Sequence, residues 1–198
     1  MERDTGPKLR LYLFGAPRIE REGAPVEVGR RKALALLAYL AATRQSHTRE
    51  TLAALLWPEY EPASAKGEVR RALSAIRKAL GDGWLDADRE VVRLNDGLWL
   101  DVAQFQHLLK VCQQHGHPPT EVCLACRDPL TEAAALAQDE FMAGFTLPDS
   151  PTFDDWQSYE REGLRRDLAG ALERLARLLG RSAEESTEQA IGYARRWL

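Results

Sequence analysis

The segment CQQHGHPPTEVCLAC, residues 112–126, concentrates metal-binding side chains: it holds all three cysteines and two of the four histidines of the chain. A CxxC pair ends the segment. A turn made by a glycine and two prolines separates this pair from the earlier cysteine and the two histidines. Zinc takes four nitrogen or sulfur ligands and favours thiolate and imidazole. The segment therefore predicts a structural zinc site made from four of these five: Cys112, His115, His117, Cys123 and Cys126.

The same cluster has two other interpretations. One is a redox CxxC, although no strand precedes the pair as in a βαβ unit. In the other, Cys112 continues the apolar face of Phe105, Leu108 and Leu109, and the remaining groups are incidental. A catalytic zinc is disfavoured, because no accompanying glutamate or open coordination position is indicated.

The stretch EVRRALSAIRKALGD, Glu68–Asp82, indicates a different chemistry, the binding of an anion by basic side chains. At 100° per residue it forms an amphipathic helix, with apolar residues on one side and Arg70, Arg71, Ser74 and Lys78 on the other. A basic face of this kind indicates an anionic partner such as the phosphates of a nucleic acid. The alternative is an amphipathic surface helix whose arginines are merely solvated.

The composition of the whole chain limits the number of domains and the kind of partner to be expected. The chain has 198 residues, 44% of them hydrophobic, which suits one large domain or two smaller ones. Its net charge of -3 hides a basic half and an acidic half: residues 30–78 carry ten Lys or Arg against four Asp or Glu, and residues 121–160 carry one against nine. We find no apolar run of about 20 residues and no signal peptide, and we expect a cytoplasmic protein.

The elements around the basic helix must position it. Strand-like alternation in LRLYLFG, PRIER and PVEV precedes a largely buried helix, RRKALALLAYLAA. A short helix capped by Thr48 and ended by Trp57-Pro58 follows, and then the basic helix, 63–80, which stops at Gly81. The segments WLDAD, EVVRLND and LWLD read as short strands. This order is typical of a winged helix-turn-helix, whose third helix enters the major groove.

Arg30, Arg31 and Lys32 stand at the entry of the first helix, where cations oppose the helix dipole. We therefore expect them to serve a ligand. Farther along, FMAGFTLPDSPTF, residues 141–153, reads as a loop or short helix with exposed aromatic residues that packs within a bundle or docks on the winged helix or a partner. A long amphipathic helix follows, with an apolar stripe of Trp156, Tyr159, Leu164, Leu168, Leu172, Leu175 and Leu179.

Two parts of the chain resemble a known group of bacterial activators, the SARP/AfsR group. Residues 8–100 are similar to its OmpR-type winged-helix domain through RRKALALLAYLA, LAALLWPE and RRALSAIRKALGD. Residues 101–198 resemble its bacterial transcriptional activator domain through DVAQF and LAQDEFMAGFTLPDSPTFDDWQSYEREGLRRDLAGALERLA. The resemblance implies a mainly α fold with small antiparallel β elements: a winged helix-turn-helix domain followed by an α-helical, tetratricopeptide-like domain.

The resemblance also implies a function, that of a sequence-specific DNA-binding transcriptional activator. Its partners would be double-stranded DNA, RNA polymerase and a second protomer on the DNA. Glu68, close to the groove-facing side, would repel phosphate unless it accepts from a cytosine or pairs with a neighbour. The implied DNA-binding residues are Lys66, Gly67, Arg70, Arg71, Ser74, Arg77 and Lys78, with Arg93 in the hairpin contacting the backbone.

Two other function classes compete. A winged-helix scaffold that docks proteins instead of DNA is the alternative, supported by Glu68 and the negative net charge. An enzyme is disfavoured, because the sequence offers no Ser/His/Asp set, no paired carboxylates in a catalytic context and no phosphate loop. The last helix, STEQAIGYARRWL, leaves Ile191, Ala194 and Leu198 seeking a partner. We therefore expect one piece of a longer regulator, which could carry a sensor or nucleotide-binding module.

Overall fold

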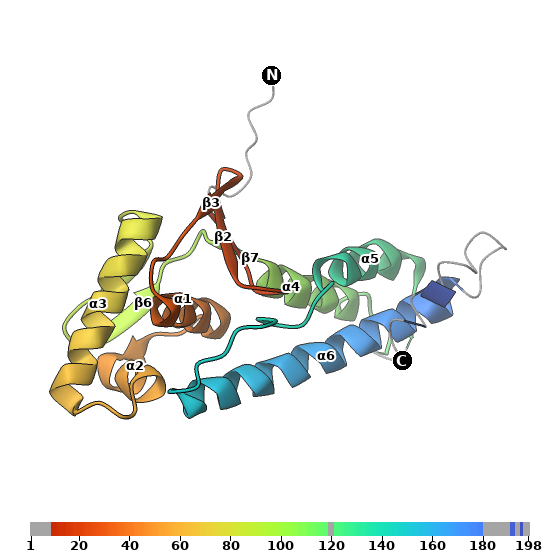
Figure 1. Ribbon diagram of the computed structural model, residues 1–198. Helices are drawn as coiled ribbons and strands as arrows, with labels where there is room; N and C mark the ends of the chain where they lie inside the picture. The colour runs from red at the N-terminus through yellow and green to blue at the C-terminus, as the bar shows by residue number, and fades with distance from the viewer. Residues whose placement is uncertain (1–8, 119–120, 180–190, 193–194, 196–198) are drawn as a thin grey trace, which may run out of the picture.

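The computed structural model describes residues 9–118, 121–179, 191–192 and 195 (Figure 1). Its first layer is a four-stranded sheet of order β3-β2-β1-β7. Three of these strands are the predicted N-terminal ones, paired antiparallel, whereas the fourth comes from the end of the predicted hairpin and runs parallel to β1. The bounds are β1 Leu9–Tyr12, β2 Arg18–Arg21, β3 Ala24–Val26 and β7 Trp99–Leu100.

The winged helix forms next to this sheet. Thr48 caps α2, since its hydroxyl accepts the N–H of Thr51 at 3.1 Å, and Gly81, with a φ of 79°, ends α3 as expected. A second sheet, β4-β6-β5, supplies the wing. The elements are α1 Arg31–Thr43, β4 His47–Thr48, α2 Arg49–Leu56, α3 Pro62–Leu80, β5 Leu85–Ala87 and β6 Val91–Leu94.

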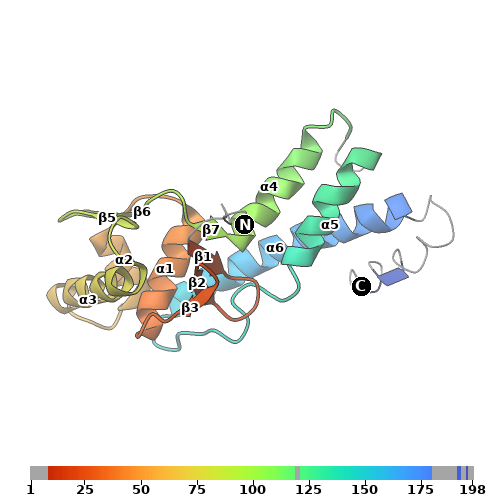
Figure 2. The same cartoon turned by 90° about the horizontal axis from the view of Figure 1, so that it is seen from above.

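Three helices follow, α4 Asp101–Gln113, α5 Arg127–Leu136 and α6 Pro151–Leu179, with a single 3-10 turn, η1 Leu124–Cys126, before α5. Figures 1 and 2 show α6 beginning beside α2 and running beneath α4 and α5. The fold class is therefore as predicted: mainly α with small β elements, a winged helix-turn-helix followed by an α-helical, tetratricopeptide-like part. No helix among the described residues is long and apolar enough to cross a membrane.

One continuous hydrophobic core joins the two parts, from Leu9 in β1 to Leu164 in α6. Asp101, at the first position of α4, lies in this core with 2% of its surface exposed. Its carboxylate accepts the backbone N–H groups of Leu13, Phe14 and Val102 at 2.7–2.9 Å. Burial nevertheless raises the pKa of Asp101 above its ordinary value, against the lowering effect of these donors. The carboxylate thus bonds the two residues that follow β1 to the start of α4, where the two parts meet.

Residues 141–150 cross from α5 past α1 to the start of α6, and we call this segment the strap (Figure 1). The expectation of exposed aromatic residues here is wrong, because Phe141, Phe145 and Phe153 are all buried. The strap packs on the winged helix, one of the placements that the sequence left open. Met142 donates its N–H to the carbonyl of Leu13 at 2.7 Å.

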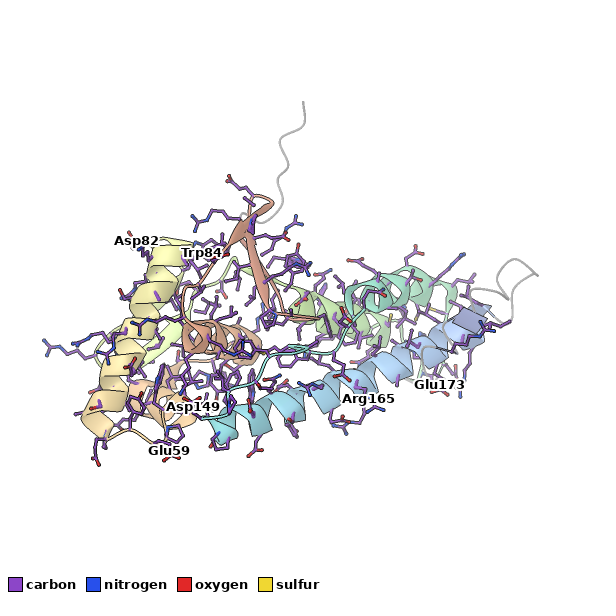
Figure 3. All side chains as sticks on the ribbon, in the orientation of Figure 1. Glu59, Asp82, Trp84, Asp149, Arg165 and Glu173 are labelled. Atoms are coloured by element: carbon purple, nitrogen blue, oxygen red, sulfur yellow. The ribbon has the colours of Figure 1, made fainter. Side chains whose placement is uncertain are left out.

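The cations at the start of α1 explain where the strap is held. The Arg31 guanidinium donates to the carbonyl of Thr146 at 3.0 Å and lies over the ring of Phe145. Lys32 pairs with Asp149 at 2.8 Å, next to the start of α6 (Figure 3). In the structure both side chains thus bind the protein itself, whereas the sequence suggested a ligand.

The apolar stripe of α6 is correct except at one position. Tyr159 is 73% exposed, whereas Gln157, two residues earlier, is buried. The Gln157 amide donates to the carbonyls of Met142 and Phe145, so a polar side chain on α6 satisfies the strap backbone. The expected last helix, STEQAIGYARRWL, lies almost wholly outside the described residues.

Candidate nucleic-acid interface and metal site

Helix α3 buries Val69, Leu73 and Ile76 in the core and turns its cations outward. We call this outward surface the basic face. Gly67, at its edge, is half-buried. The cations and Ser74 of this surface are exposed, as expected for the polar side of an amphipathic helix, and their contact with DNA stays a prediction. The basic face consists of Lys66, Arg70, Arg71, Ser74, Arg77 and Lys78, all exposed.

Two acids pair with cations on or beside this face. Glu68 bonds Arg71 at 2.5 Å and Arg30 at 3.5 Å, and the Arg71 hydrogen bond holds the pKa of Glu68 below its ordinary value. Glu50 on α2 pairs with Lys66 at 2.6 Å. Of the two alternatives set out for Glu68, the structure therefore shows the pairing with a neighbour.

A shallow hollow of about 670 Å³ adjoins the basic face. Arg49 from the start of α2, Lys66 and Arg70 from α3, and Arg89 from the wing turn line it. Arg49 also donates to the carbonyl of Asp88 at 2.8 Å, which ties α2 to the wing. Three elements thus place four cations around one concave surface, a suitable shape for a phosphate backbone.

Arg49 and Arg89 were missed from the sequence. Arg49 follows the Thr48 cap directly, and Arg89 occupies the predicted Asp88-Arg89 turn, so each stood next to a recognised signal. The predicted hairpin contact, Arg93, lies elsewhere: it lines a separate hollow of about 90 Å³ beside the C-terminal end of α1. The structure does not bring Arg93 to the hollow beside α3.

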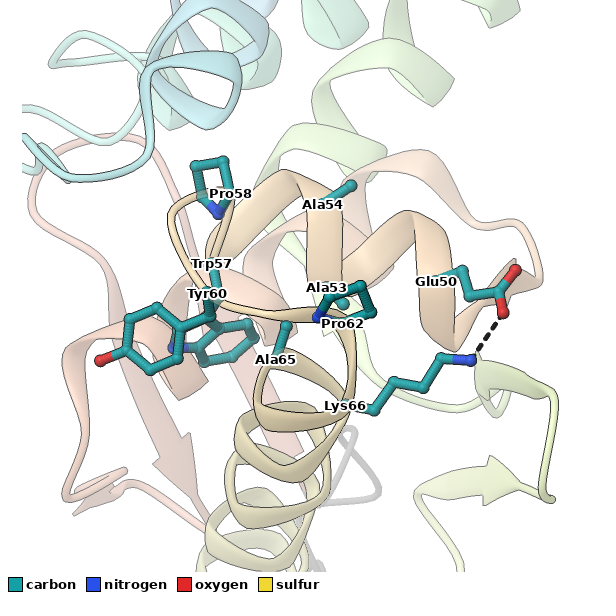
Figure 4. A pocket seen from close by; sticks show the side chains of 9 residues that line it. All are labelled: Glu50, Ala53, Ala54, Trp57, Pro58, Tyr60, Pro62, Ala65 and Lys66. Atoms are coloured by element: carbon teal, nitrogen blue, oxygen red, sulfur yellow. Dashed lines mark hydrogen bonds and ion pairs between the residues drawn. The ribbon is translucent and has the colours of Figure 1, made fainter.

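A pocket of about 470 Å³ lies between α2 and the start of α3 (Figure 4). Alanines, prolines and the rings of Trp57 and Tyr60 form its walls. Glu50 and Lys66, which pair with each other at one rim, are its charged lining residues.

The Cys and His side chains meet in the turn between α4 and α5. We call this set the metal corner: His115, His117, Cys123 and Cys126. Their ligand atoms all lie within 4.8 Å of one another. The cluster could therefore bind a metal ion, as the sequence predicted for four of five candidates.

The distances in the metal corner resemble the edges of a tetrahedron. Cys123 Sγ lies 3.7 Å from Cys126 Sγ, and His115 Nδ1 lies 3.4 Å and 3.2 Å from these two sulfurs. His117 Nε2 lies 3.1 Å from Cys126 Sγ. Around zinc the corresponding S–S and S–N edges are about 3.8 Å and about 3.6 Å, from tetrahedral angles and the usual bond lengths.

Neighbouring groups orient the ligands. His117 Nδ1 lies 3.0 Å from the carbonyl of Pro118. In the tautomer with its proton on Nδ1, the ring would donate to this carbonyl and could bind an ion through the Nε2 lone pair. Arg174 of α6 contacts Cys126 Sγ at 3.8 Å. Burial would raise the pKa of Cys126, but hydrogen bonds from the Cys123 backbone, His115 and His117 lower it to about 6.

Cys112 does not belong to the metal corner. Its thiol is fully buried on α4, 3.9 Å from the carbonyl of Cys126, and burial together with the neighbouring Cys126 raises the pKa of Cys112 to about 11. The thiol packs in a small apolar cluster with Leu130 and Leu172, as the face of Phe105 and Leu108 predicted. Of the five candidates, the structure thus brings together the HxH pair and the CxxC pair.

Comparison with known proteins leaves function open but supports the fold. No family model matches the chain, and no curated protein matches it. A solved structure of Mycobacterium tuberculosis EmbR in complex with low affinity phosphopeptide is similar, with a TM-score of 0.66 and 18% sequence identity over 96% of this chain. The chain spans 59% of that EmbR chain. At this identity the likeness shows a shared fold, and this agrees with the predicted winged helix followed by a helical part.

Proposed function

We propose that this protein is a sequence-specific DNA-binding transcriptional regulator, an activator that reads the major groove with α3. The observation that carries the proposal is the basic face: six polar or charged side chains point outward from a helix whose other side is fully packed. They contribute little to the core, so a binding role explains their clustering better than a folding role does. The hollow between α2, α3 and the wing supports it.

The residues have different roles in this proposal. Arg70 and Arg71 are placed to bond guanine through O6 and N7, while Ser74 is short enough to let the helix approach. Gly67 helps in the same way, since a Cβ at this position would meet only Arg71 Nη2 within 4 Å outside the backbone of its own helix. Phosphate contacts fall to the cations at the edges: Arg49, Lys66, Arg77, Lys78 and Arg89.

The helical part gives the regulator its other partners. Residues 121–160 carry nine acids against one Arg, which suits a protein partner such as RNA polymerase or a second protomer and not DNA. We assign residues 8–100 to the DNA-binding domain and residues 101–198 to the activator domain, acting in the cytoplasm. The fold, with its winged helix ahead of a helical part, supports this division of labour.

Selection from a random DNA pool at several salt concentrations tests the function. Enrichment of one motif, with affinity falling steeply as salt rises, is expected, because phosphate contacts release counterions. Arg70→Ala should weaken the enrichment, whereas Arg165→Ala, an exposed arginine on α6, is the matched control and should not. Absence of binding even at low salt would favour the docking scaffold instead.

We also propose that the metal corner holds a structural zinc ion. Two thiolates and two imidazoles form a closed set of the type found in structural zinc sites, and their spacing is close to the tetrahedral edges of zinc. The Pro118 carbonyl, which fixes the His117 ring, is the kind of outer partner that such ligands have. The ion would fix the turn between α4 and α5.

Metal analysis of reductively purified protein tests the zinc. About one equivalent is expected, and less than about half an equivalent would overturn the proposal. Cys123→Ser should abolish binding, because it removes one of four ligands. Cys112→Ser is the matched control: it changes the third thiol, outside the ligand set, and should leave the zinc content unchanged.

A further inference from the structure

Glu68 is an acid beside a surface that we assign to DNA, and its contacts suggest a use. Its side chain is 19% exposed, far less than the 50% of Arg71 and the 54% of Arg30. One carboxylate oxygen bonds Arg71 Nη2 at 2.5 Å, and the other faces Arg30 Nη1 at 3.5 Å. Both oxygens are therefore engaged with cations and not directed freely at the groove.

The local backbone lets Arg71 lie back toward Glu68. A Cβ built on Gly67 would stand 3.9 Å from Arg71 Nη2, so the guanidinium lies close above this glycine, one turn before its own position. Helical side chains lean in this direction, toward the N-terminus. The guanidinium uses one end for Glu68, and its half-exposed remainder keeps donors for another acceptor.

Glu68 is itself anchored to the body of the protein. Arg30 immediately precedes α1, and the next two residues, Arg31 and Lys32, bind the strap. The carboxylate thus lies between Arg30, from the residue that precedes α1, and Arg71 of the basic face. An arginine oriented in advance loses less conformational freedom when it binds, which favours a fork geometry over loose phosphate contact.

We propose that Glu68 is a positioning residue that orients Arg71 for one guanine of the operator and so sets the base preference at that position. The inference rests on the proposed DNA-binding function. Glu68 acts through Arg71, which predicts that the two residues govern the same base pair. A cytosine contacted directly by Glu68 would instead make the losses of the two single variants add, whether or not that cytosine pairs with the guanine contacted by Arg71.

The test compares motifs selected from a random pool by the wild type, Glu68→Gln, Arg71→Ala and the double variant. Arg71→Ala identifies the position at which guanine preference is lost. Glu68→Gln should reduce preference at that same position by about 3- to 10-fold, and the double variant should lose no more than Arg71→Ala alone. Glu50→Gln, which removes the other paired acid near this face, should change affinity without altering base preference.

The outcomes separate this inference from the function on which it rests. If the wild type enriches no motif, the DNA-reading function fails and the inference fails with it. If the wild type enriches a motif but Glu68→Gln keeps full preference at the Arg71 position, only the inference fails. A Glu68→Gln effect at another position, or losses that add in the double variant, would also overturn it. Unchanged thermal melting of each variant excludes misfolding as the cause.

Discussion

The basic face and the metal corner carry the two groups of candidate functional side chains, and they rest on different parts of the hydrophobic core. Beneath the basic face, Val69, Leu73 and Ile76 belong to the large core that joins both parts of the protein. The metal corner lies on a separate and smaller cluster, with seven buried residues in the part of the chain that the structure describes, two of them cysteines. The cations of α3 are thus added to a helix that packs without them, whereas two of the corner's residues, Cys123 and Cys126, themselves pack in or against its small cluster.

The largest expected effect comes from a change in the metal corner, which should lower stability without changing the DNA affinity of the basic face. Cys126→Ser removes a buried ligand, and because structural zinc sites bind with about 10 kcal/mol or more, the free energy of unfolding should fall by at least about 3 kcal/mol. Denaturant unfolding with and without a chelator measures this. DNA affinity of the folded variant should stay within about 2-fold, since α3 lies at the opposite end of the molecule (Figure 1). A chelator-insensitive wild type would contradict the prediction.

The second prediction concerns Asp101, at the junction between the winged helix and the helical part. Asp101→Asn leaves backbone donors of Leu13 and Phe14 without a full acceptor, so unfolding should become easier by about 1.5 to 3 kcal/mol. The exposed Asp96→Asn is the control and should change stability by less than about 0.5 kcal/mol. Equal effects of the two changes would show that the carboxylate does not join β1 to α4 energetically.

The third prediction concerns a change that should weaken DNA binding and leave the stability of the protein almost unchanged. Arg71→Ala should weaken binding to the selected operator by about 1 to 3 kcal/mol, the value of a bidentate base contact. Its thermal stability should hardly change, because Arg71 is exposed on a helix packed by other residues. Titration of the operator and a melting curve on the same sample check both. Unchanged affinity would remove Arg71 from the base-contacting set.

The smallest effect is expected at the strap. The hydrogen bond from Lys32 holds the pKa of Asp149 below its ordinary value. This pair therefore adds stability above the ordinary aspartate pKa, and the contribution is lost as the pH falls through the lowered value. Asp149→Asn should remove that acid-side decline and cost less than about 1 kcal/mol at neutral pH, because the pair is partly exposed. Unfolding measured from neutral to acid pH, with Asp155→Asn as control, tests it.

Local signals predicted the winged helix well. The Thr48 cap, the Trp57-Pro58 stop and Gly81 placed α2 and the end of α3 correctly, and α3 starts at Pro62, one residue before the expected start. The two-residue strand β4 and the parallel pairing of β7 with β1 were missed, because so short a run has little readable alternation and distant partners set its pairing. The contacts of Arg31 and Lys32 with the strap, more than 100 residues away in the chain, have no local signal.

In the candidate sites too, local sequence signals predicted part of the arrangement, and distant contacts determine the rest. Spacing identified the CxxC pair and the turn, but it could not choose among Cys112, His115 and His117, because Cys112 shares a helix face with both apolar residues and a histidine. The structure separates them by burial: Cys112 points into the apolar cluster. Tyr159 was placed in the α6 stripe by its period, yet Gln157 occupies the buried side to bond the strap, which periodicity cannot reveal.

The strap also bears on how proteins with this fold can be recombined. Exchanging residues 8–100 alone for those of another protein would separate Thr146 and Asp149 from the Arg31 and Lys32 side chains that bind them. It would also change the residues around the Leu56 carbonyl, to which the Ser150 hydroxyl donates at 2.7 Å. A chimera cut at Asp101 would thus join mismatched halves. The unit that can be transplanted with its contacts intact is the winged helix together with the strap and the first turns of α6.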